Sequence, residues 1–239
     1  MMLCLDSGNT RLKWALMEDD QWTAGGALLP AELGQLASSV KAFPSPTRII
    51  GCNVAGTARA QEIETALSGE VLWIAPVRQQ CGVTNGYDAP EKLGADRWDA
   101  LVGARALHRG DALVILAGTA TTIDVLDAHG RHHGGLILPG LDMMAKALAS
   151  GTADLPAAKG CYQPQPRNTH DAIVSGAIHA TLGAIRRMFD TLAEKRGATC
   201  LVSGGAAEAL LNQLDLPNRR IDNLVLEGLA CIAAEPDPA

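Results

Sequence analysis

A short glycine-centred turn between two apolar runs occurs twice in this chain, at positions that differ by 110 residues (8 and 118). The first turn is Asp6-Ser7-Gly8-Asn9-Thr10 and the second is Gly118-Thr119-Ala120. Each pattern predicts a strand, a tight turn and a returning strand. Internal duplication is the simplest explanation, and it limits the chain to folds built from two related halves. The flanking apolar runs are 3–5 and 12–17 in the first half, and 112–116 and 121–126 in the second.

The remaining pattern of each half predicts strands followed by alternating helices and strands. We therefore expect an α/β fold of two lobes, 1–107 and 108–239, in which mixed sheets are flanked by helices. The further predicted strands are 22–29, 48–52, 71–75, 131–138 and 201–203. The predicted helices are 31–42, 58–67, 91–107, 141–149, 171–192, 206–211 and 224–234, with turn formers at 81–90 and an irregular loop at 151–166.

Composition excludes several classes of protein. With 47% hydrophobic residues, 19% charged residues and a net charge of −6, the 239-residue chain is typical of a globular protein and not of a disordered one. No basic cluster is longer than the pairs Arg186-Arg187 and Arg219-Arg220, so we expect no nucleic-acid partner. No apolar run reaches the roughly 18 residues of a membrane span, and Asp6 interrupts any signal-peptide core. We expect a cytoplasmic protein with no membrane partner, whose six separated cysteines are reduced thiols.

The first turn, from Asp6 to Lys13, is the first candidate site. A glycine-containing hairpin can direct several backbone N–H groups at phosphate oxygens, and a carboxylate at a strand end can orient hydrated Mg²⁺. Lys13 adds positive charge. An ordinary tight turn also uses Gly and Asn, and for this segment alone that is the favoured interpretation.

The second turn, Gly118-Thr119, favours phosphate binding over an ordinary tight turn, because a nucleotide held between duplicated lobes needs a phosphate-binding turn from each lobe. Thr119, Thr121 and Thr122 offer hydroxyl groups, although alternating Thr residues are also good strand formers.

A third candidate is Gly94-Ala95-Asp96-Arg97, at the predicted start of a helix. The helix dipole favours an ionised Asp96, which could then orient a substrate hydroxyl or accept its proton. Arg97 could pair with an anionic substrate group. Helix capping by an acid is the alternative.

Other glycine turns allow close approach to a base or ribose, or are plain helix entries. The histidines in one predicted hairpin lack Cys or carboxylate groups at ligand spacing, so we do not predict a metal there. The turns are Gly134-Gly135, Pro139-Gly140 and Ser203-Gly204-Gly205, and the histidines are His129, His132 and His133.

Together these segments resemble the type III pantothenate kinases, part of the acetate and sugar kinase, Hsp70 and actin superfamily. The resemblance extends through most of the chain, and the motifs occur in the family's order. They are D-x-G-N-T-x-x-K at 6–13, N-x-Y-x-x-P-x-x-L-G-A-D-R at 85–97, G-T-A-T-T-I-D at 118–124, G-G-L-I-L-P-G at 134–140, R-N-T-x-x-A-I-x-x-G at 167–176 and S-G-G at 203–205.

The resemblance implies ATP-dependent phosphorylation of pantothenate at its primary hydroxyl, the first step toward coenzyme A. It also implies two ribonuclease-H-like lobes, and a homodimer with sites near the interface. Asp6 would hold Mg²⁺ indirectly, and Asp96 would accept the hydroxyl proton. The implied ATP-binding residues are Asp6, Ser7, Gly8, Asn9, Thr10, Arg11, Leu12, Lys13 and Thr119. The implied pantothenate-binding residues are Tyr87, Gly94, Ala95, Asp96, Arg97 and Thr169.

The sequence departs from the family at Leu116, where much of the family carries an Asp that coordinates a monovalent cation. Leucine has no oxygen donor for K⁺ or NH₄⁺, so we expect weaker or altered cation dependence. The offset of 110 residues places Leu116 opposite Asp6.

Two alternatives remain open from the sequence. Some relatives of this family are described as accessory factors for transcription, so the fold could serve a regulatory protein that binds a partner. The intact Asp6, Lys13, Asp96, Arg97 and Thr169 argue against loss of catalysis. Another sugar or acid kinase of the superfamily would share the ATP site and differ around Tyr87 and Thr169.

Overall fold

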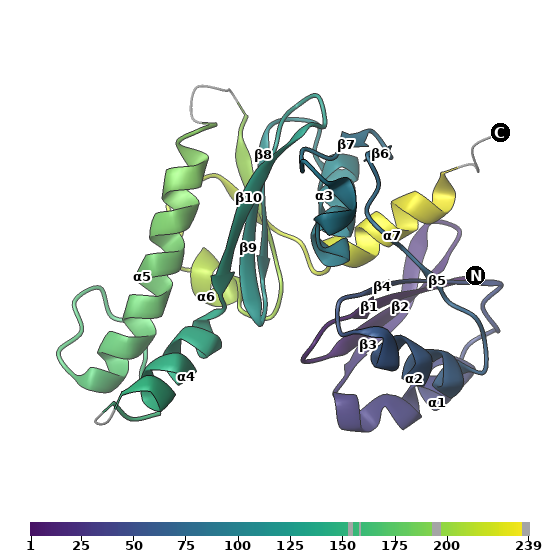
Figure 1. Cartoon of the computed structure of the whole chain (residues 1–239), viewed down its shortest axis with the longest axis horizontal. Helices are drawn as coiled ribbons and strands as arrows, with labels where there is room; N and C mark the ends of the chain where they lie inside the picture. Colours follow the sequence, from purple (N-terminus) through teal and green to yellow (C-terminus); the bar gives the residue numbers. More distant parts are fainter. Residues whose placement is uncertain (153–154, 158, 193–196, 236–239) are drawn as a thin grey trace. The chain divides into compact units, whose positions relative to one another are not determined.

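The computed structural model describes residues 1–152, 155–157, 159–192 and 197–235. The chain forms two compact units (Figure 1). The first unit comprises residues 1–107 together with the chain from residue 223 onward, and the second comprises residues 108–222.

The first unit is built on a five-stranded mixed sheet of order β3-β2-β1-β4-β5. The first three strands are antiparallel neighbours, whereas β4 runs parallel to β1 and β5 runs parallel to β4. The strands are β1 (Met2–Ser7), β2 (Leu12–Glu18), β3 (Gln21–Leu28), β4 (Arg48–Asn53) and β5 (Leu72–Trp73).

The second unit repeats this sheet strand for strand, in the order β10-β9-β8-β11-β12. Its first three strands are again antiparallel, and β11 and β12 again run parallel to their inner neighbours. The strands are β8 (Ala112–Ala117), β9 (Ala120–Leu126), β10 (His132–Pro139), β11 (Thr199–Ser203) and β12 (Asn218–Arg220). The repeated order confirms the predicted α/β fold of duplicated ribonuclease-H-like lobes.

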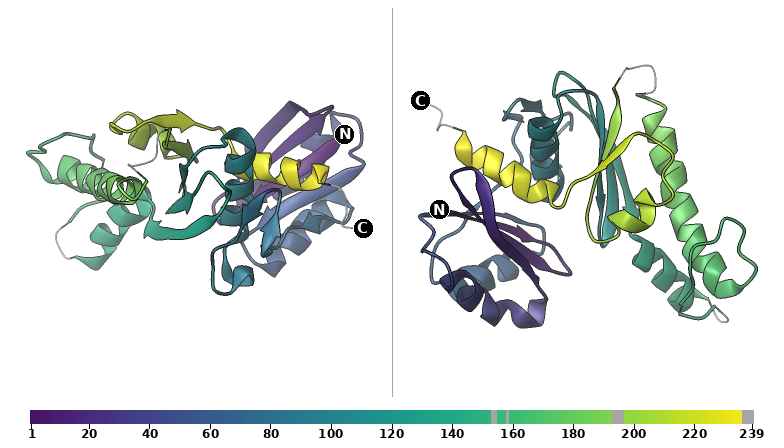
Figure 2. Two further views of the ribbon diagram at one scale, coloured as in Figure 1. Left: turned by 90° about the horizontal axis from the view of Figure 1, so that it is seen from above. Right: turned by 180° about the vertical axis from the view of Figure 1, so that it is seen from behind.

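Helices cover both faces of the sheet in the first unit (Figures 1 and 2). Side chains alternate along β1, so Leu3 and Leu5 lie in the core with Leu36 of α1 and Ile63 of α2. Cys4 and Asp6 therefore point to the opposite face, which α3 and α7 cover. The helices are the 3₁₀ turn η1 (Pro30–Gln35), α1 (Leu36–Lys41), α2 (Thr57–Leu67), η2 (Pro90–Lys92), α3 (Ala95–Leu107) and α7 (Leu224–Ala234).

In the second unit α5 (Thr169–Phe189) lies along one face of the sheet, as both views show (Figures 1 and 2). Its Ile185 and Phe189 share a core with Leu113 and Ile115 of β8. This unit also contains α4 (Leu141–Gly151) and α6 (Ala207–Leu211). Among the described residues, no helix is both long and apolar enough to cross a membrane.

The C-terminal helix α7 packs in the first unit, although the sequence analysis assigned it to the second lobe. The physical reason is a close approach of α7 to α3 at two glycines. A Cβ atom at Gly228 would collide with the backbone carbonyl of Asp99, and one at Gly103 would collide with that of Leu224. The two backbones therefore touch directly, which places α7 on the sheet face that α3 covers.

Several other elements differ from the predicted ones. The predicted helix 91–107 starts at Ala95, because Pro90–Lys92 forms a 3₁₀ turn and Leu93 is extended. The predicted helix 31–42 is divided between η1 and α1, and the predicted strand 71–75 is only two residues long. The turn-rich segment 81–90 contains part of an unpredicted hairpin, β6 (Gln79–Gln80) and β7 (Val83–Thr84), and β12 was also not predicted. The predicted loop 151–166 has no helix or strand in its described part after Gly151, and residues 153, 154 and 158 of it lie outside the described residues.

Candidate active site

The turn between β1 and β2 closes with a backbone hydrogen bond from Gly8 N to Arg11 O of 3.1 Å. Asp6 lies opposite Lys13 in the antiparallel register, and Lys13 Nζ is 3.4 Å from Asp6 Oδ2. The Lys13 side chain is 36% exposed and that of Asp6 only 11%. The residues of the turn after Gly8, which are Asn9, Thr10 and Arg11, are exposed. This arrangement presents an accessible polar loop and an ammonium group beside a shielded carboxylate.

Asn223 is a second partner of Asp6 that the sequence analysis missed. Its Nδ2 donates to Asp6 Oδ2 at 3.5 Å, and its Oδ1 accepts hydrogen bonds from the backbone N of Val225 and Leu226. Asn223 is thus the N-cap of α7 and also contacts the end of β1. An Asn directly before the apolar run 224–226 is a recognised helix-start signal, which could have identified the cap but not its contact with Asp6.

The start of α3 holds the carboxylate of Asp96 in a folded-back position. Asp96 Oδ1 accepts a hydrogen bond of 2.9 Å from the backbone N of Arg97. A Cβ atom at Gly94 would lie 2.7 Å from the same oxygen, which is closer than real Cβ atoms approach. Glycine at position 94 therefore leaves room for the carboxylate beside the helix N-terminus, where the dipole favours a negative charge.

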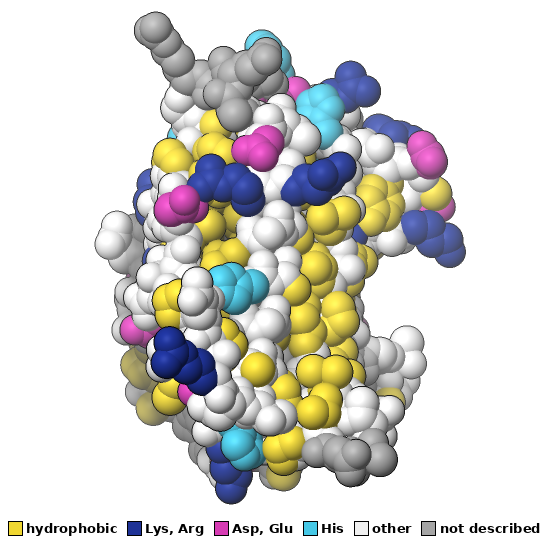
Figure 3. All heavy atoms as spheres, turned by 90° about the vertical axis from the view of Figure 1, so that its left-hand side faces the viewer, with side chains coloured by type: hydrophobic (Ala, Val, Ile, Leu, Met, Phe, Trp, Pro, Cys, Tyr) yellow, Lys and Arg dark blue, Asp and Glu magenta, His cyan; other side chains and the backbone are white. Residues whose placement is uncertain are grey.

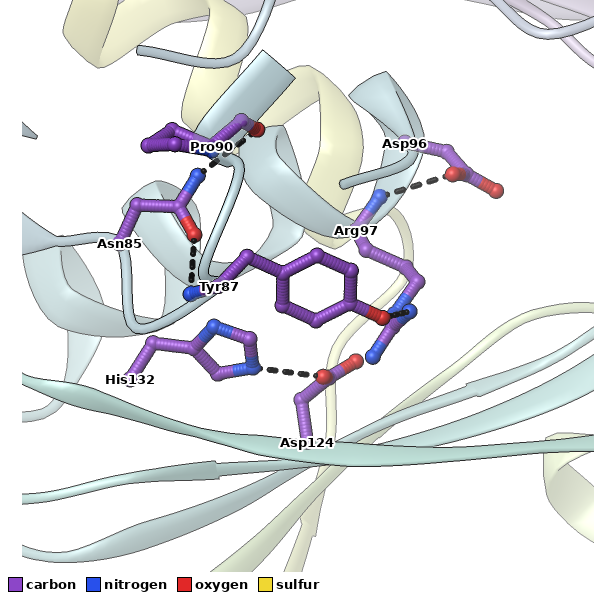
Figure 4. A network of polar contacts seen from close by, with 7 residues as sticks. All are labelled: Asn85, Tyr87, Pro90, Asp96, Arg97, Asp124 and His132. Carbon is purple, nitrogen blue, oxygen red and sulfur yellow. Dashed lines mark hydrogen bonds and ion pairs between the residues drawn. The ribbon is translucent and has the colours of Figure 1, made fainter. Parts of the chain in front are cut away.

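Tyr87 is fixed by Arg97, which is 3% exposed. Arg97 Nη1 donates to Tyr87 Oη over 2.6 Å, and the guanidinium carbon lies 5.3 Å from the centre of the tyrosine ring (Figure 4). The backbone around Tyr87 is held by Asn85, whose Oδ1 accepts from Tyr87 N and whose Nδ2 donates to the carbonyl of Pro90 (Figure 4). Arg78 donates to the carbonyls of Asn85 and Tyr87. The buried Asn85 thus has a structural role in the motif that the resemblance singled out.

Asp99 lies one turn after Asp96 in α3 and is completely buried. Within the part of the chain that the structure describes, neither of its carboxylate oxygens has a conventional hydrogen-bond partner, and the Cys52 thiol, a weak donor, lies beside it. Burial raises the pKa of Asp99 well above its usual range, and the charges of Asp6 and Asp96 raise it further, whereas the Cys52 contact lowers it. The surroundings of Asp99 therefore favour its neutral form, and the charges of both Asp6 and Asp96 act on it.

In the second unit, the turn after β8 also begins with a glycine whose backbone N–H closes the turn, but this loop (118–119) is two residues shorter than the loop after β1 (8–11). Gly118 N donates to Ala120 O over 3.0 Å, and Gly140 N donates to Thr119 O over 2.9 Å. A Cβ atom at Gly140 would collide with the carbonyls of Gly118 and Thr119. Gly140 therefore packs directly under this turn, and Gly118 and Thr119 are left exposed.

Thr169 is the first residue of α5 and is exposed. The preceding Asn168 caps the helix, since its Oδ1 accepts from Asp171 N at 2.9 Å. Part of the R-N-T motif thus starts a helix. Two of the histidines are paired with carboxylates, His132 with Asp124 at 2.8 Å (drawn in Figure 4) and His133 with Asp127 at 2.7 Å. In the described residues no group of three or more His, Cys, Asp or Glu side chains could hold a metal ion.

The remaining glycine turns have structural explanations. Gly204 has a φ of +109° and a Cβ atom there would collide with the backbone of Ala117, so the segment after β11 lies directly against β8. Gly135 packs equally closely on the backbone of Ile123 and Asp124. These contacts account for Gly204 and Gly135 without a ligand.

The first unit thus contains the predicted segments Asp6–Lys13 and Gly94–Arg97 with Tyr87, and Asp99 lies close to the acids of both. Thr119 and Thr169 belong to the second unit, at an exposed turn and an exposed helix start. Two five-stranded mixed sheets of identical order, each with a glycine turn after its first strand, make up a duplicated α/β fold that is also found in a sugar-acid kinase of known structure. A 2-dehydro-3-deoxygalactonokinase from Sinorhizobium meliloti shares the fold, with a TM-score of 0.61 at 15% identity and 98% of each chain covered.

The chain belongs to the type III pantothenate kinase family, whose model matches residues 2–191. The type III pantothenate kinase of Aromatoleum aromaticum is 53% identical, with 98% of each chain covered. That of Dechloromonas aromatica is 47% identical, with 98% of this chain and 99% of the relative covered. The chain is accordingly a phosphotransferase that phosphorylates pantothenate in coenzyme A biosynthesis, and membership of a kinase family implies use of ATP.

The regulatory alternative is not favoured by these similarities. A protein described as a Baf family transcriptional activator, from Campylobacter jejuni, has a TM-score of 0.62, but it is only 19% identical over 96% of each chain, which shows the fold alone.

Replacement of Asp99 should change how stability depends on pH. Because the folded-state pKa of Asp99 is raised, the folded chain binds more protons than the unfolded chain above the ordinary aspartate pKa of 3.8. Its contribution to the free energy of unfolding therefore falls as pH rises, with a limiting slope of about 1.4 kcal/mol per pH unit. Asp99→Asn should remove this slope between pH 4 and 7 in urea unfolding. The exposed Asp88→Asn is the matched control, and an unchanged slope in Asp99→Asn would show that Asp99 is ionised in the folded chain.

Proposed function

We propose that Asp96 is the group that accepts the proton of the primary hydroxyl of pantothenate. The observation that carries this proposal is the position of its carboxylate, folded over Gly94 at the N-terminus of α3 and held by the backbone N of Arg97. The helix dipole favours the ionised form, which is the form a proton acceptor needs.

We assign ATP to the first turn and to Thr119. The loop 8–11, in which residues 9–11 are exposed, offers backbone N–H groups for phosphate oxygens, and the ammonium group of Lys13 offers positive charge. The shorter turn of the second unit likewise starts with a glycine, and it has an exposed Thr119. The ATP-binding residues of the proposal are Asp6, Ser7, Gly8, Asn9, Thr10, Arg11, Leu12, Lys13 and Thr119.

Mg²⁺ in phosphoryl-transfer sites is held by one or two carboxylates, by substrate phosphates and by several waters. The single, largely buried carboxylate of Asp6 fits such a site through a bridging water, because its Oδ2 also meets Lys13 and Asn223. When bound, Mg²⁺ would neutralise charge on the transferring phosphoryl group.

We assign pantothenate to Tyr87, Gly94, Ala95, Asp96, Arg97 and Thr169. The Arg97 guanidinium supplies a buried positive charge for an anionic group of the substrate, and Tyr87 is held against it. In the reaction the hydroxyl oxygen attacks the γ-phosphorus of ATP, the bond from that phosphorus to the leaving ADP oxygen breaks, and the hydroxyl proton passes to Asp96. The residues bind, orient and neutralise charge, which is the main work of the protein in phosphoryl transfer.

We also propose a cytoplasmic location. All six cysteines are free thiols, which persist in a reducing compartment.

Asp96→Asn should separate catalysis from binding. The amide keeps the size of the side chain and cannot accept the hydroxyl proton, so turnover with ATP, Mg²⁺ and pantothenate should fall by about 10² or more. Binding of ATP, measured by calorimetry, should be unchanged, and the exposed Asp88→Asn should retain full activity. Equal rates would remove Asp96 from the mechanism. No turnover by the unmodified chain, with ATP still bound, would favour the regulatory alternative or another substrate.

The position equivalent to Asp6 in the second unit is Leu116. Both residues are fifth in six-residue strands, Asp6 in β1 and Leu116 in β8. Asp6 lies opposite Lys13 and Cys52, and Leu116 lies opposite Thr122 and Ser203. An apolar side chain here removes the carboxylate that would coordinate K⁺ or NH₄⁺, and we propose that cation dependence is weaker or altered.

Activity should therefore persist when K⁺ and NH₄⁺ are replaced by a bulky organic cation in the same assay. Leu116→Asp should introduce stimulation by K⁺, since it restores an oxygen donor beside Ser203 and Thr122. Leu113→Met, a change in the core of the same strand, is the control. Complete loss of activity without K⁺ and NH₄⁺ would contradict the proposal.

We propose a homodimer formed through the second unit, near β10 and α4. The edge strand β10 exposes Ile137 (65%) and Leu136 (39%), and α4, which buries no residue, exposes Met143 (44%) and Leu148 (40%). Figure 3 shows a band of hydrophobic side chains on the side of the molecule that faces left in Figure 1, where α4 and α5 lie. Exposed aliphatic groups on an edge strand and a neighbouring helix are typical of a subunit interface.

Ile137→Lys should convert a dimer to a monomer, because a charge would then be buried in the interface. Sedimentation velocity at micromolar concentration measures this directly. Leu72→Lys is the control, since Leu72 is 49% exposed in the first unit. A monomeric unmodified chain, or an Ile137→Lys variant that stays dimeric, would contradict this interface.

A further inference from the structure

The tip of the hairpin β6–β7 carries an unusual residue for its backbone conformation. Cys81 has a φ of +49° and Gly82 a φ of +74°, so both central residues of the two-residue turn are left-handed. Turns of this kind prefer Asn, Asp or Gly, because other side chains are strained there. Cys81 is therefore held in this position by its surroundings.

Those surroundings are the end of helix α7, in the same unit. The backbone N of Cys81 donates to Glu235 Oε1 over 3.0 Å, directly after the last residue of α7. Cys231 precedes Glu235 by four residues, so it lies one helical turn earlier on the same side. The thiols of Cys81 and Cys231 are within hydrogen-bonding reach of each other.

This pair differs from the other cysteines of the chain. Cys4, Cys52 and Cys200 are buried, and Cys161 is exposed in the second unit, whereas Cys81 and Cys231 are both partly exposed and adjacent. Access and a nearby second thiol are what reversible disulfide formation requires.

We propose that Cys81 and Cys231 form a reversible intramolecular disulfide that fixes the β6–β7 hairpin to α7. The oxidant is a small-molecule disulfide such as oxidised glutathione. One cysteine thiolate attacks this disulfide and displaces one glutathione thiol, and the second cysteine then attacks the protein sulfur of the mixed disulfide and displaces the other. One small disulfide is reduced to two thiols, and two protein thiols become one protein disulfide.

The environment of Cys81 makes this reaction slow at neutral pH. Burial raises the pKa of its thiol, and the neighbouring Cys231 and Glu235, both on the α7 side, raise it further. Because only the thiolate attacks, oxidation should accelerate as pH rises from 7 to 9.

The consequence concerns the segment that follows the hairpin. β7 ends at Thr84, and the residues that follow it, Asn85 to Tyr87, lead into the proposed pantothenate site. A covalent bond at Cys81 would therefore restrain this segment. This consequence rests on the proposed function, whereas formation of the disulfide does not.

The test uses the full-length protein with oxidised glutathione, followed by counting of free thiols and peptide mapping. We expect the number of free thiols to fall from six to four, with one peptide linking Cys81 to Cys231, and dithiothreitol to reverse the change. The oxidised protein should melt at a higher temperature than the reduced protein, since the bond constrains the unfolded chain.

Two variants and one control complete the experiment. The first variant is Cys81→Asn, which should fold because Asn suits the left-handed turn. The second is Cys231→Ser, which leaves the hairpin unchanged. Both variants should abolish the linked peptide and the thermal shift. Cys161→Ser should leave both intact, because its thiol lies in the other unit. A stable glutathione adduct at Cys81 or Cys231, a bond to another cysteine, or six free thiols after treatment at pH 9 would overturn the proposal, whatever the kinase activity.

Discussion

The geometry of the first unit depends on the direct backbone contact of α3 with α7. Gly228 lies against the Asp99 carbonyl and Gly103 against that of Leu224, so neither position has room for even a methyl group. This contact sets how closely the two helices pack against each other. The start of α3 carries Asp96, and the start of α7 carries Asn223, which reaches the Asp6 carboxylate. Packing between two helix backbones therefore determines how polar groups are arranged at the end of β1.

The same packing surrounds a carboxylic acid with no conventional partner. Asp99 cannot be ionised at low cost, because it is completely buried and because Asp6 and Asp96 add negative charge nearby. The other two acids have compensation, Asp6 from the Lys13 ammonium and Asp96 from a backbone N–H at a helix N-terminus. The acid without a conventional hydrogen-bond partner is thus the one whose pKa burial raises.

Local patterns were sufficient to predict the elements that carry the motifs. Alternating apolar runs around glycine turns predicted β1, β2, β8 and β9, and the apolar run after Asn223 predicted α7 to the residue. Tertiary facts were not predictable in this way. The assignment of α7 to the first unit depends on Gly103 and Gly228, which a pattern of hydrophobic residues does not reveal. Asp99 was not singled out by any motif, and only the structure shows that it is completely buried. The roles of individual site residues remain predictions from the motifs.

The duplicated sheets have the same strand order but different electrostatics at equivalent positions. In the first unit Asp6 faces Lys13, whereas in the second Leu116 faces Thr122. Uncharged residues thus stand at both positions of the ion pair in the second unit. Replacing only one of the two charges would leave the other shielded from water without a partner, which is energetically costly. The turn after β8 nevertheless keeps its backbone hydrogen bond and its close packing on Gly140. What the two turns share is a glycine whose backbone N–H closes the turn, whereas the Asp6–Lys13 ion pair of the first unit is replaced in the second by Leu116 and Thr122.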